Sequence, residues 1–174
     1  MRTEALALTR VVDSDDFAEL YATHHAEALR LAYLLCGDPH RAEDAVAEVF
    51  AKVYRRTRRH TVEQPRAYIR RAVVNEMNSR FRRLALERRE AGRRSGDDRG
   101  ARGVEEQHAD ADVVFAALQV LPRRQRTAVV LRYYADLSEA DTAEVMAVSI
   151  GTVKSSVFRG LERMRAVLER QEEA

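Results

Sequence analysis

The chain has 174 residues and a net charge of +2, and its 45% apolar and 33% charged residues exclude wholesale disorder and a fibrous repeat. The single cysteine, Cys36, excludes an internal disulfide framework and a multi-cysteine zinc site. No stretch approaches the roughly 18 uncharged apolar residues of a membrane span, and the start has no signal-peptide core. We therefore expect a soluble, cytoplasmic protein of one mid-sized domain or two small ones.

Three helices are predicted in the first half. The first covers residues 16–36 and ends at Gly37, a residue type suited to closing a helix. Asp38 and Pro39 have the residue types of an N-cap and a first helical position, so they open the second helix. Pro65 opens the third, whose outward face is polar and mostly basic: Arg66, Arg70, Arg71, Asn75, Asn78 and Arg82.

Residues 85–109 separate the two halves of the chain. They are rich in arginine, glycine and aspartate and poor in apolar residues, which predicts a flexible linker. No alternating β pattern and no repeat occurs. The sequence thus predicts an all-α protein with two small helical domains, residues 16–84 and 110–170, joined by that linker.

The second half predicts four helices. One covers residues 113–121, and Pro122 opens another. Ser138, with Asp141 three residues later, resembles a capping box and starts a short helix that ends near residue 147. Ser149 caps the last helix.

The last helix has two contrasting faces. Its predicted core stripe is Ile150, Val153, Val157, Leu161, Met164 and Leu168. The opposite, acid-free sector is Thr152, Ser155, Ser156, Arg159 and Arg163. Two short helices joined by a turn of about three residues, the second with hydroxyls and arginines outward, form a helix-turn-helix pattern that can read duplex DNA. The alternative is an ordinary surface helix in a bundle.

The charge is segregated along the chain. Residues 1–50 hold 4 lysines and arginines against 10 acids, residues 51–102 hold 17 against 6, and residues 103–174 hold 9 against 12. A basic centre between acidic ends is expected of a protein that binds a polyanion. A solvated arginine-rich helix next to a disordered linker is the other interpretation.

Other residue types predict no separate chemistry. Tyr54, Tyr68 and Phe81 can stack on unpaired bases, although aromatic residues at helical spacing are more often core. No two histidines form an i, i+4 pair, and no phosphate-binding glycine loop, HExxH motif or nucleophile elbow occurs. We expect no metal, no cofactor and no enzymatic activity.

Three stretches resemble one family: LRLAYLLCGDPHRAEDAVAEVF, then PRAYIRRAVVNEMNSRFRR, then LPRRQRTAVVLRYYADLSEADTAEVMAVSIGTVKSSVFRGLERMR. They are similar to bacterial RNA polymerase sigma factors of the extracytoplasmic-function (ECF) group, in the family's order and on both sides of the linker. The resemblance covers residues 16–168. It implies a protein that binds core RNA polymerase, directs it to promoters and helps to open the DNA.

The resemblance also implies roles by position. The second helix would dock on the clamp helices of the polymerase β′ subunit through Asp44, Glu48, Val49 and Phe50. The minus-ten promoter element would meet His60, Gln64, Arg66, Arg70, Arg71 and Asn75. The minus-thirty-five element would meet Thr152, Lys154, Ser155, Ser156, Arg159 and Arg163. Other faces of the second half would contact the β flap, and an anti-sigma factor is a further partner that the resemblance allows.

The chain departs from the family pattern at three positions. Ala47 stands where the family often has glutamine, and Tyr54 where it often has tryptophan. Ala147 replaces a frequent turn glycine, so we expect mild strain at a left-handed residue. Two rivals remain at this point: a free-standing helix-turn-helix repressor, which has no use for an acidic second helix, and a protein-only helical adaptor.

Overall fold

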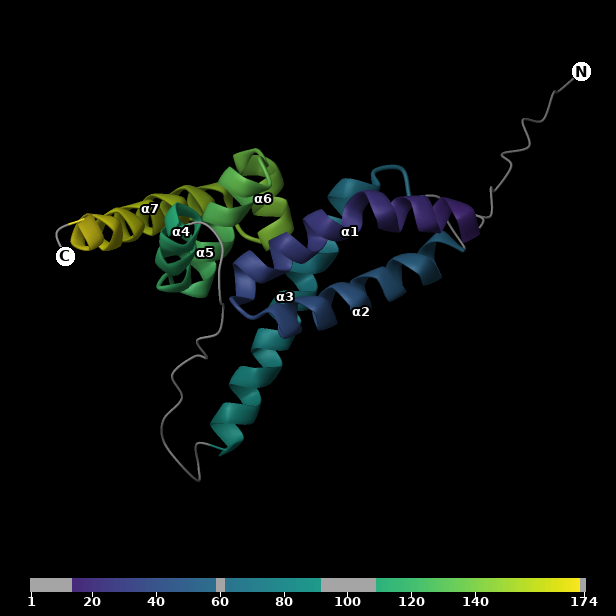
Figure 1. Ribbon diagram of the computed structural model, residues 1–174, viewed down its shortest axis with the longest axis horizontal. Coiled ribbons are helices and arrows are strands. Elements are labelled where there is room, and N and C mark those ends of the chain that lie inside the picture. The colour runs from purple at the N-terminus through teal and green to yellow at the C-terminus, as the bar shows by residue number, and fades with distance from the viewer. Residues whose placement is uncertain (1–13, 59–61, 92–108, 173–174) are drawn as a thin grey trace, which may run out of the picture.

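The computed structural model describes residues 14–58, 62–91 and 109–172, and the regular secondary structure in these ranges is entirely helical (Figure 1). In chain order the elements are α1 (Ser14–Cys36), α2 (Pro39–Thr57), α3 (Pro65–Ala91), α4 (Ala109–Gln119), α5 (Arg123–Val129), the π-helical η1 (Val130–Tyr134), α6 (Glu139–Met146) and α7 (Ile150–Glu172). The all-α prediction is confirmed for the described residues.

Helices α1, α2 and α3 pack together around the core of the first half. Gly37 closes α1 with a φ of 73°, and the Asp38 side chain accepts a hydrogen bond from the Arg41 N–H at 3.0 Å, as its N-cap role predicts. The residues that fill this core are almost fully buried: Leu31, Leu35, Val46, Val49, Phe50, Val53, Val73, Val74 and Met77. The two local signals thus place the turn that folds α2 back onto α1.

Helix α3 is longer than predicted. It continues to Ala91, so residues 85–91, expected in the linker, are helical. The lower end of α3 extends away from the other helices in Figure 1. The rest of the expected linker, residues 92–108, lies outside the described residues.

The second half is built from α4 to α7. The Ser138 hydroxyl accepts from the Asp141 N–H at 3.0 Å and the Ser149 hydroxyl from the Thr152 N–H at 3.2 Å, so both predicted caps are confirmed. The π-helical segment was not predicted. There the Ala135 N–H bonds to the Val130 carbonyl, five residues back, at 3.1 Å.

The buried face of α7 differs from the predicted stripe. Val153 is fully buried, but Ile150 and Leu161 are 45% and 38% exposed. Ser156 and Gly160 are buried instead. A Cβ atom on Gly160 would lie 2.8 Å from Val129 Cγ2 of α5, so the small residues on this face let α5 and α7 approach closely.

The two halves pack against each other in the described structure. Helix α1 contacts α4, α5 and η1, and α3 contacts α6. One hydrophobic cluster includes residues of both halves, and α6 lies beside the first half in Figure 1. The two predicted helical domains are therefore in direct contact.

Candidate nucleic-acid interface

Helices α6 and α7 form a helix-turn-helix with a left-handed turn residue. Ala147 has a φ of 53° and a ψ of 50°. The Val148 N–H bonds to the Ala143 carbonyl at 3.0 Å and the Ala147 N–H to the Glu144 carbonyl at 3.2 Å, the two bonds of a Schellman motif. The left-handed geometry expected at Ala147 is confirmed. It turns the chain so that α7 begins directly after α6.

We predict that Ala147→Gly stabilises the protein. An alanine in the left-handed region carries a cost that glycine avoids, so the free energy of unfolding should rise by about 1 kcal/mol. Urea denaturation of the full chain measures the change. The same substitution at Ala51, an exposed residue within α2, should instead lower stability by about 1 kcal/mol. A loss of stability in both variants would contradict the strain at Ala147.

The N-terminal half of α7 presents hydroxyls and cations to solvent. Lys154, Ser155, Arg159 and Arg163 are exposed and Thr152 is half-buried. The Lys154 Nζ lies 3.4 Å from a Glu139 carboxylate oxygen. No hydrogen-bond or ion-pair partner reaches the Arg159 and Arg163 guanidinium groups from within the described ranges. Both are therefore available to a phosphate or a base edge.

Ser156 corrects the predicted reading face. Ser156 is only 6% exposed and lies on the side of α7 that packs on the rest of the second half. A buried hydroxyl cannot reach a groove of DNA. Ser156 has a hydroxyl group like Thr152 and Ser155, so the sequence analysis placed it on the same face. A small polar residue also suits a close contact between helices.

Two arginines of α3 converge on one acid of α1. The Arg66 Nε donates to Glu27 at 3.0 Å, and the Arg70 Nη2 lies 2.7 Å from the other carboxylate oxygen. Burial works to raise the pKa of Glu27, but the hydrogen bonds and charges of Arg66 and Arg70 outweigh it and hold the pKa below its ordinary value. The Arg70 side chain is 12% exposed, so it mainly supports the face rather than forming it.

The rest of the predicted minus-ten face is more accessible. Gln64, Arg71 and Asn75 are exposed. The Arg71 guanidinium forms an ion pair with Glu144 of α6. His60 lies outside the described residues. Sequence reasoning missed both Glu27 and Glu144, because each lies tens of residues from its arginine partners and no local pattern announces the pairing.

Helix α2 carries an exposed acidic row. Asp44 is exposed and Glu48 is half-exposed, with the Lys52 Nζ and an Arg55 nitrogen 3.7 and 3.6 Å from the Glu48 carboxylate. Lys52 also donates to Glu76 of α3 at 2.6 Å. Neighbouring cations thus hold the carboxylate of Glu48 in place on the surface of α2.

Val49 and Phe50 do not belong to this exposed row. They are 0% and 3% exposed and lie in the core of the first half. Neither can contact a partner in this structure, which corrects the prediction that they form part of a docking face. They follow Glu48 directly, but a helix turns by about 100° per residue, so neighbours in sequence point to different faces.

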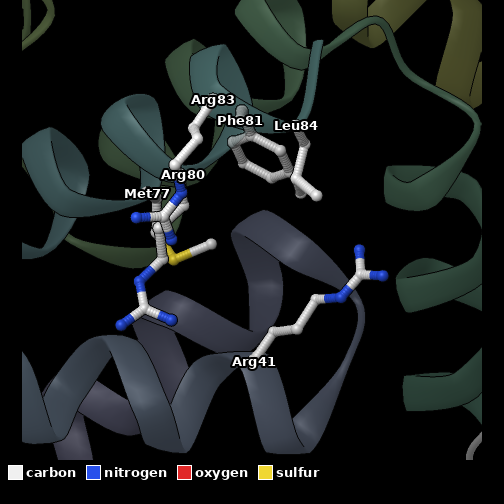
Figure 2. Close-up of a pocket in the computed structure, with 6 residues that line it drawn as sticks. All are labelled: Arg41, Met77, Arg80, Phe81, Arg83 and Leu84. Carbon is white, nitrogen blue, oxygen red and sulfur yellow. The ribbon is translucent and has the colours of Figure 1, made fainter. Parts of the chain in front are cut away.

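A small pocket opens between α2 and α3 beside the acidic row. Figure 2 shows Met77, Phe81 and Leu84 of α3 around the hollow, with Arg41 of α2 across from them. The volume is about 150 Å³, and Arg80 and Arg83 also line it. The lining therefore combines three apolar side chains with three arginines.

The three candidate stacking rings already have cationic neighbours. Arg58 lies 5.9 Å from the Tyr54 ring centroid, and Arg56 lies 5.2 Å from that of Tyr68. The Phe81 ring is covered by Arg123 of α5 at 4.8 Å. Of the three, Tyr54 is the one whose ring is exposed, and it lies at the end of α2. It is therefore the ring most accessible to a base.

Two features are absent from the described ranges. None of the helices there is long and apolar enough to cross a membrane. Nor does any group of three or more histidine, cysteine and acidic side chains come together there in a way that could hold a metal ion.

Comparisons with known proteins agree with this architecture. The family described as Sigma-70 region 2 matches residues 20–87, and Sigma-70, region 4 matches residues 112–164. The RNA polymerase sigma-E factor of Streptomyces coelicolor is 35% identical over 88% of this chain and 86% of its own length. The ECF RNA polymerase sigma factor SigW of Bacillus subtilis is 26% identical over 90% of each chain.

A solved structure shares the fold. The sigma factor RpoE, in complex with the anti-sigma factor NepR from Bartonella quintana, has a TM-score of 0.73 and 22% identity, covering 89% of this chain and 98% of that one.

A region 2 followed by a region 4 defines an RNA polymerase sigma factor, and the chain belongs to this sigma-70 family. Within the family it is an ECF-group sigma factor, and it directs transcription initiation. Neither the free-standing repressor nor the protein-only adaptor is favoured by these findings.

Proposed function

We propose that α7 grips the minus-thirty-five element through Thr152, Lys154, Ser155, Arg159 and Arg163. The observation that carries this proposal is the exposed, acid-free face at the start of α7, immediately after a capped helix-turn-helix turn. Hydroxyls and N–H groups at the helix start suit phosphate oxygens, and a free guanidinium suits the O6 and N7 atoms of guanine.

We propose that the exposed part of the α3 face engages the minus-ten strand. Gln64, Arg71 and Asn75 would contact it, while Arg66 and Arg70 would supply positive charge from their sites on Glu27. Tyr54 supports this proposal because its exposed ring can stack on an unpaired base. His60 stays a predicted member of this face.

The acidic row of α2 is the proposed contact for core RNA polymerase. Asp44 and Glu48 would meet basic residues of the β′ clamp helices, and the pocket beside them would take an apolar side chain. The second half would meet the β flap. An anti-sigma factor is proposed as an inhibitory partner, as in the complex of RpoE with NepR. We further propose that the protein works in the cytoplasm and that any catalysis belongs to the polymerase.

The experiment that tests the whole proposal is promoter-specific transcription in vitro. Core RNA polymerase is supplied with genomic DNA fragments, with and without this chain, and the transcript starts are mapped. Defined starts that require the chain support the proposed roles. Starts that do not change when the chain is added would contradict them.

We predict that Glu48→Lys weakens binding to core polymerase by about tenfold. The new lysine repels a basic partner. The substitution also removes the ion pairs that Glu48 forms with Lys52 and Arg55. Titration of labelled chain with core polymerase measures the dissociation constant. Glu19→Lys makes the same charge change at an exposed position of α1 and should bind normally. Equal losses in the two variants would mean that only net charge matters.

A further inference from the structure

Glu76 of α3 shares its cations with the acidic row of α2, which Asp44 and Glu48 form. The Glu76 side chain is only 12% exposed, against 75% for Asp44 and 44% for Glu48. An acid this far from water needs close cations or hydrogen bonds to stay charged. Glu76 has two cations: the Lys52 Nζ lies 2.6 Å from one carboxylate oxygen, and the Arg80 Nε donates to the other at 2.9 Å.

The same two cations face the acidic row at greater distances. The Lys52 Nζ lies 3.7 Å from the Glu48 carboxylate, and an Arg80 nitrogen lies 3.9 Å from the Asp44 carboxylate. Arg80 also donates to the Asp44 main-chain carbonyl at 2.9 Å, which keeps its side chain beside the row. The attraction between two charges is stronger at short distance and where less water surrounds them. Lys52 and Arg80 are therefore held mainly by Glu76.

The charge of Glu76 is maintained at neutral pH. Burial works to raise the pKa of Glu76, but the hydrogen bonds and charges of Lys52 and Arg80 outweigh it and hold the pKa below its ordinary value. A chain of ion pairs between α2 and α3 then links three acids and three cations: Asp44, Glu48, Glu76, Lys52, Arg55 and Arg80. Without the Glu76 charge, two acids would face three cations.

We propose that Glu76 is a positioning residue for the polymerase contact: it holds Lys52 and Arg80, so that the carboxylates of Asp44 and Glu48 stay available to a basic partner. This inference rests on the proposed function of the acidic row. A basic partner can then approach the two surface acids without displacing their cationic neighbours. The effect is one of charge complementarity, so it acts on binding and is screened by salt.

Glu76→Gln tests the proposal, because it removes the charge of Glu76 and keeps the size of the side chain. Lys52 and Arg80 then turn to the acidic row and neutralise it, so core polymerase should bind the full chain about fivefold more weakly at low salt. At about 0.5 M salt the variant and the unmodified chain should bind equally, because exposed charges are screened there. Titration of the labelled full chain with core polymerase measures both dissociation constants.

Lys52→Met provides a charge rescue. When it is combined with Glu76→Gln, two acids face two cations again, and the affinity should return to within about twofold of that of the unmodified chain. A purely structural defect at Glu76 would not be repaired by the loss of a second charge. Glu19→Gln makes the same substitution at an exposed position of α1 and should bind normally at both salt concentrations.

A second measurement needs no polymerase. Urea denaturation of Lys52→Met, Glu48→Gln and the double variant gives the coupling between Lys52 and Glu48. This coupling should become stronger in the Glu76→Gln background, because Lys52 has then lost its closer acid. Circular dichroism shows whether each variant keeps its helices. If Glu76→Gln loses them, Lys52→Met alone still tests the proposal, since it leaves Glu76 in place and should bind core polymerase about twofold more tightly.

The outcomes separate the positioning role from the function on which it rests. Normal binding of Glu76→Gln at low salt, an equal loss at both salt concentrations, or weaker binding of Lys52→Met would overturn the positioning role. An unchanged coupling between Lys52 and Glu48 would show that Glu76 does not hold Lys52. Normal polymerase binding by Glu48→Lys would refute the proposed function of the acidic row, while the coupling would still decide whether Glu76 holds the cation.

Discussion

Arg159→Ala should weaken promoter selection by on the order of 1 to 3 kcal/mol, the range expected when one arginine contact to a base is lost. Arg159 is exposed on the acid-free face of α7, and no partner in the described structure occupies its guanidinium. Loss of the side chain should therefore remove the proposed DNA contact without breaking an internal one. Transcription by the reconstituted polymerase on a cognate promoter and on a promoter with an altered minus-thirty-five element measures the selectivity.

Arg165 supplies the matched control for this prediction. It is an exposed arginine of the same helix, six residues on, and its Nε lies 3.2 Å from the Glu169 carboxylate. Because a helix turns by about 100° per residue, Arg165 points away from Arg159. Arg165→Ala should keep the selectivity. Equal selectivity in the two variants would remove Arg159 from the reading face.

Gly160→Val should destabilise the second half by about 3 kcal/mol. Any Cβ at this position would lie 2.8 Å from Val129 Cγ2, and a valine side chain adds two more carbons against α5. Val129 is itself 4% exposed and has little room to move. Urea denaturation of the full chain, followed by far-ultraviolet circular dichroism, should show a lower midpoint, and promoter activity should fall with it.

Gly151→Val controls for the change of residue type. A Cβ at Gly151 would meet only the Ser149 hydroxyl, at 4.0 Å, so the space there is open. Its effect on the free energy of unfolding should stay within about 0.5 kcal/mol. If both variants lost the same stability, helix flexibility rather than the contact between α5 and α7 would explain the loss.

Three consecutive residues of α2 show what a sequence pattern could not predict: which side chains reach the surface. The resemblance to the family predicted one docking face that included Glu48, Val49 and Phe50. Only Glu48 reaches solvent, because the first half buries the other two in its core. Ser156 was misplaced for the same reason, since the facing helix decides which side of α7 is covered.

The helix starts and the helix-turn-helix turn could be predicted from the amino-acid sequence, because they depend on hydrogen bonds between residues a few positions apart. Asp38, Ser138 and Ser149 cap their own helices, and Ala147 turns its own chain. The buried face of α7 and the contact between the two halves could not be predicted in this way. Those outcomes depend on close approach at Gly160, on the Glu144 ion pair and on the hydrogen bond from Gln119 to the Leu34 carbonyl, which join residues up to 85 positions apart in the chain.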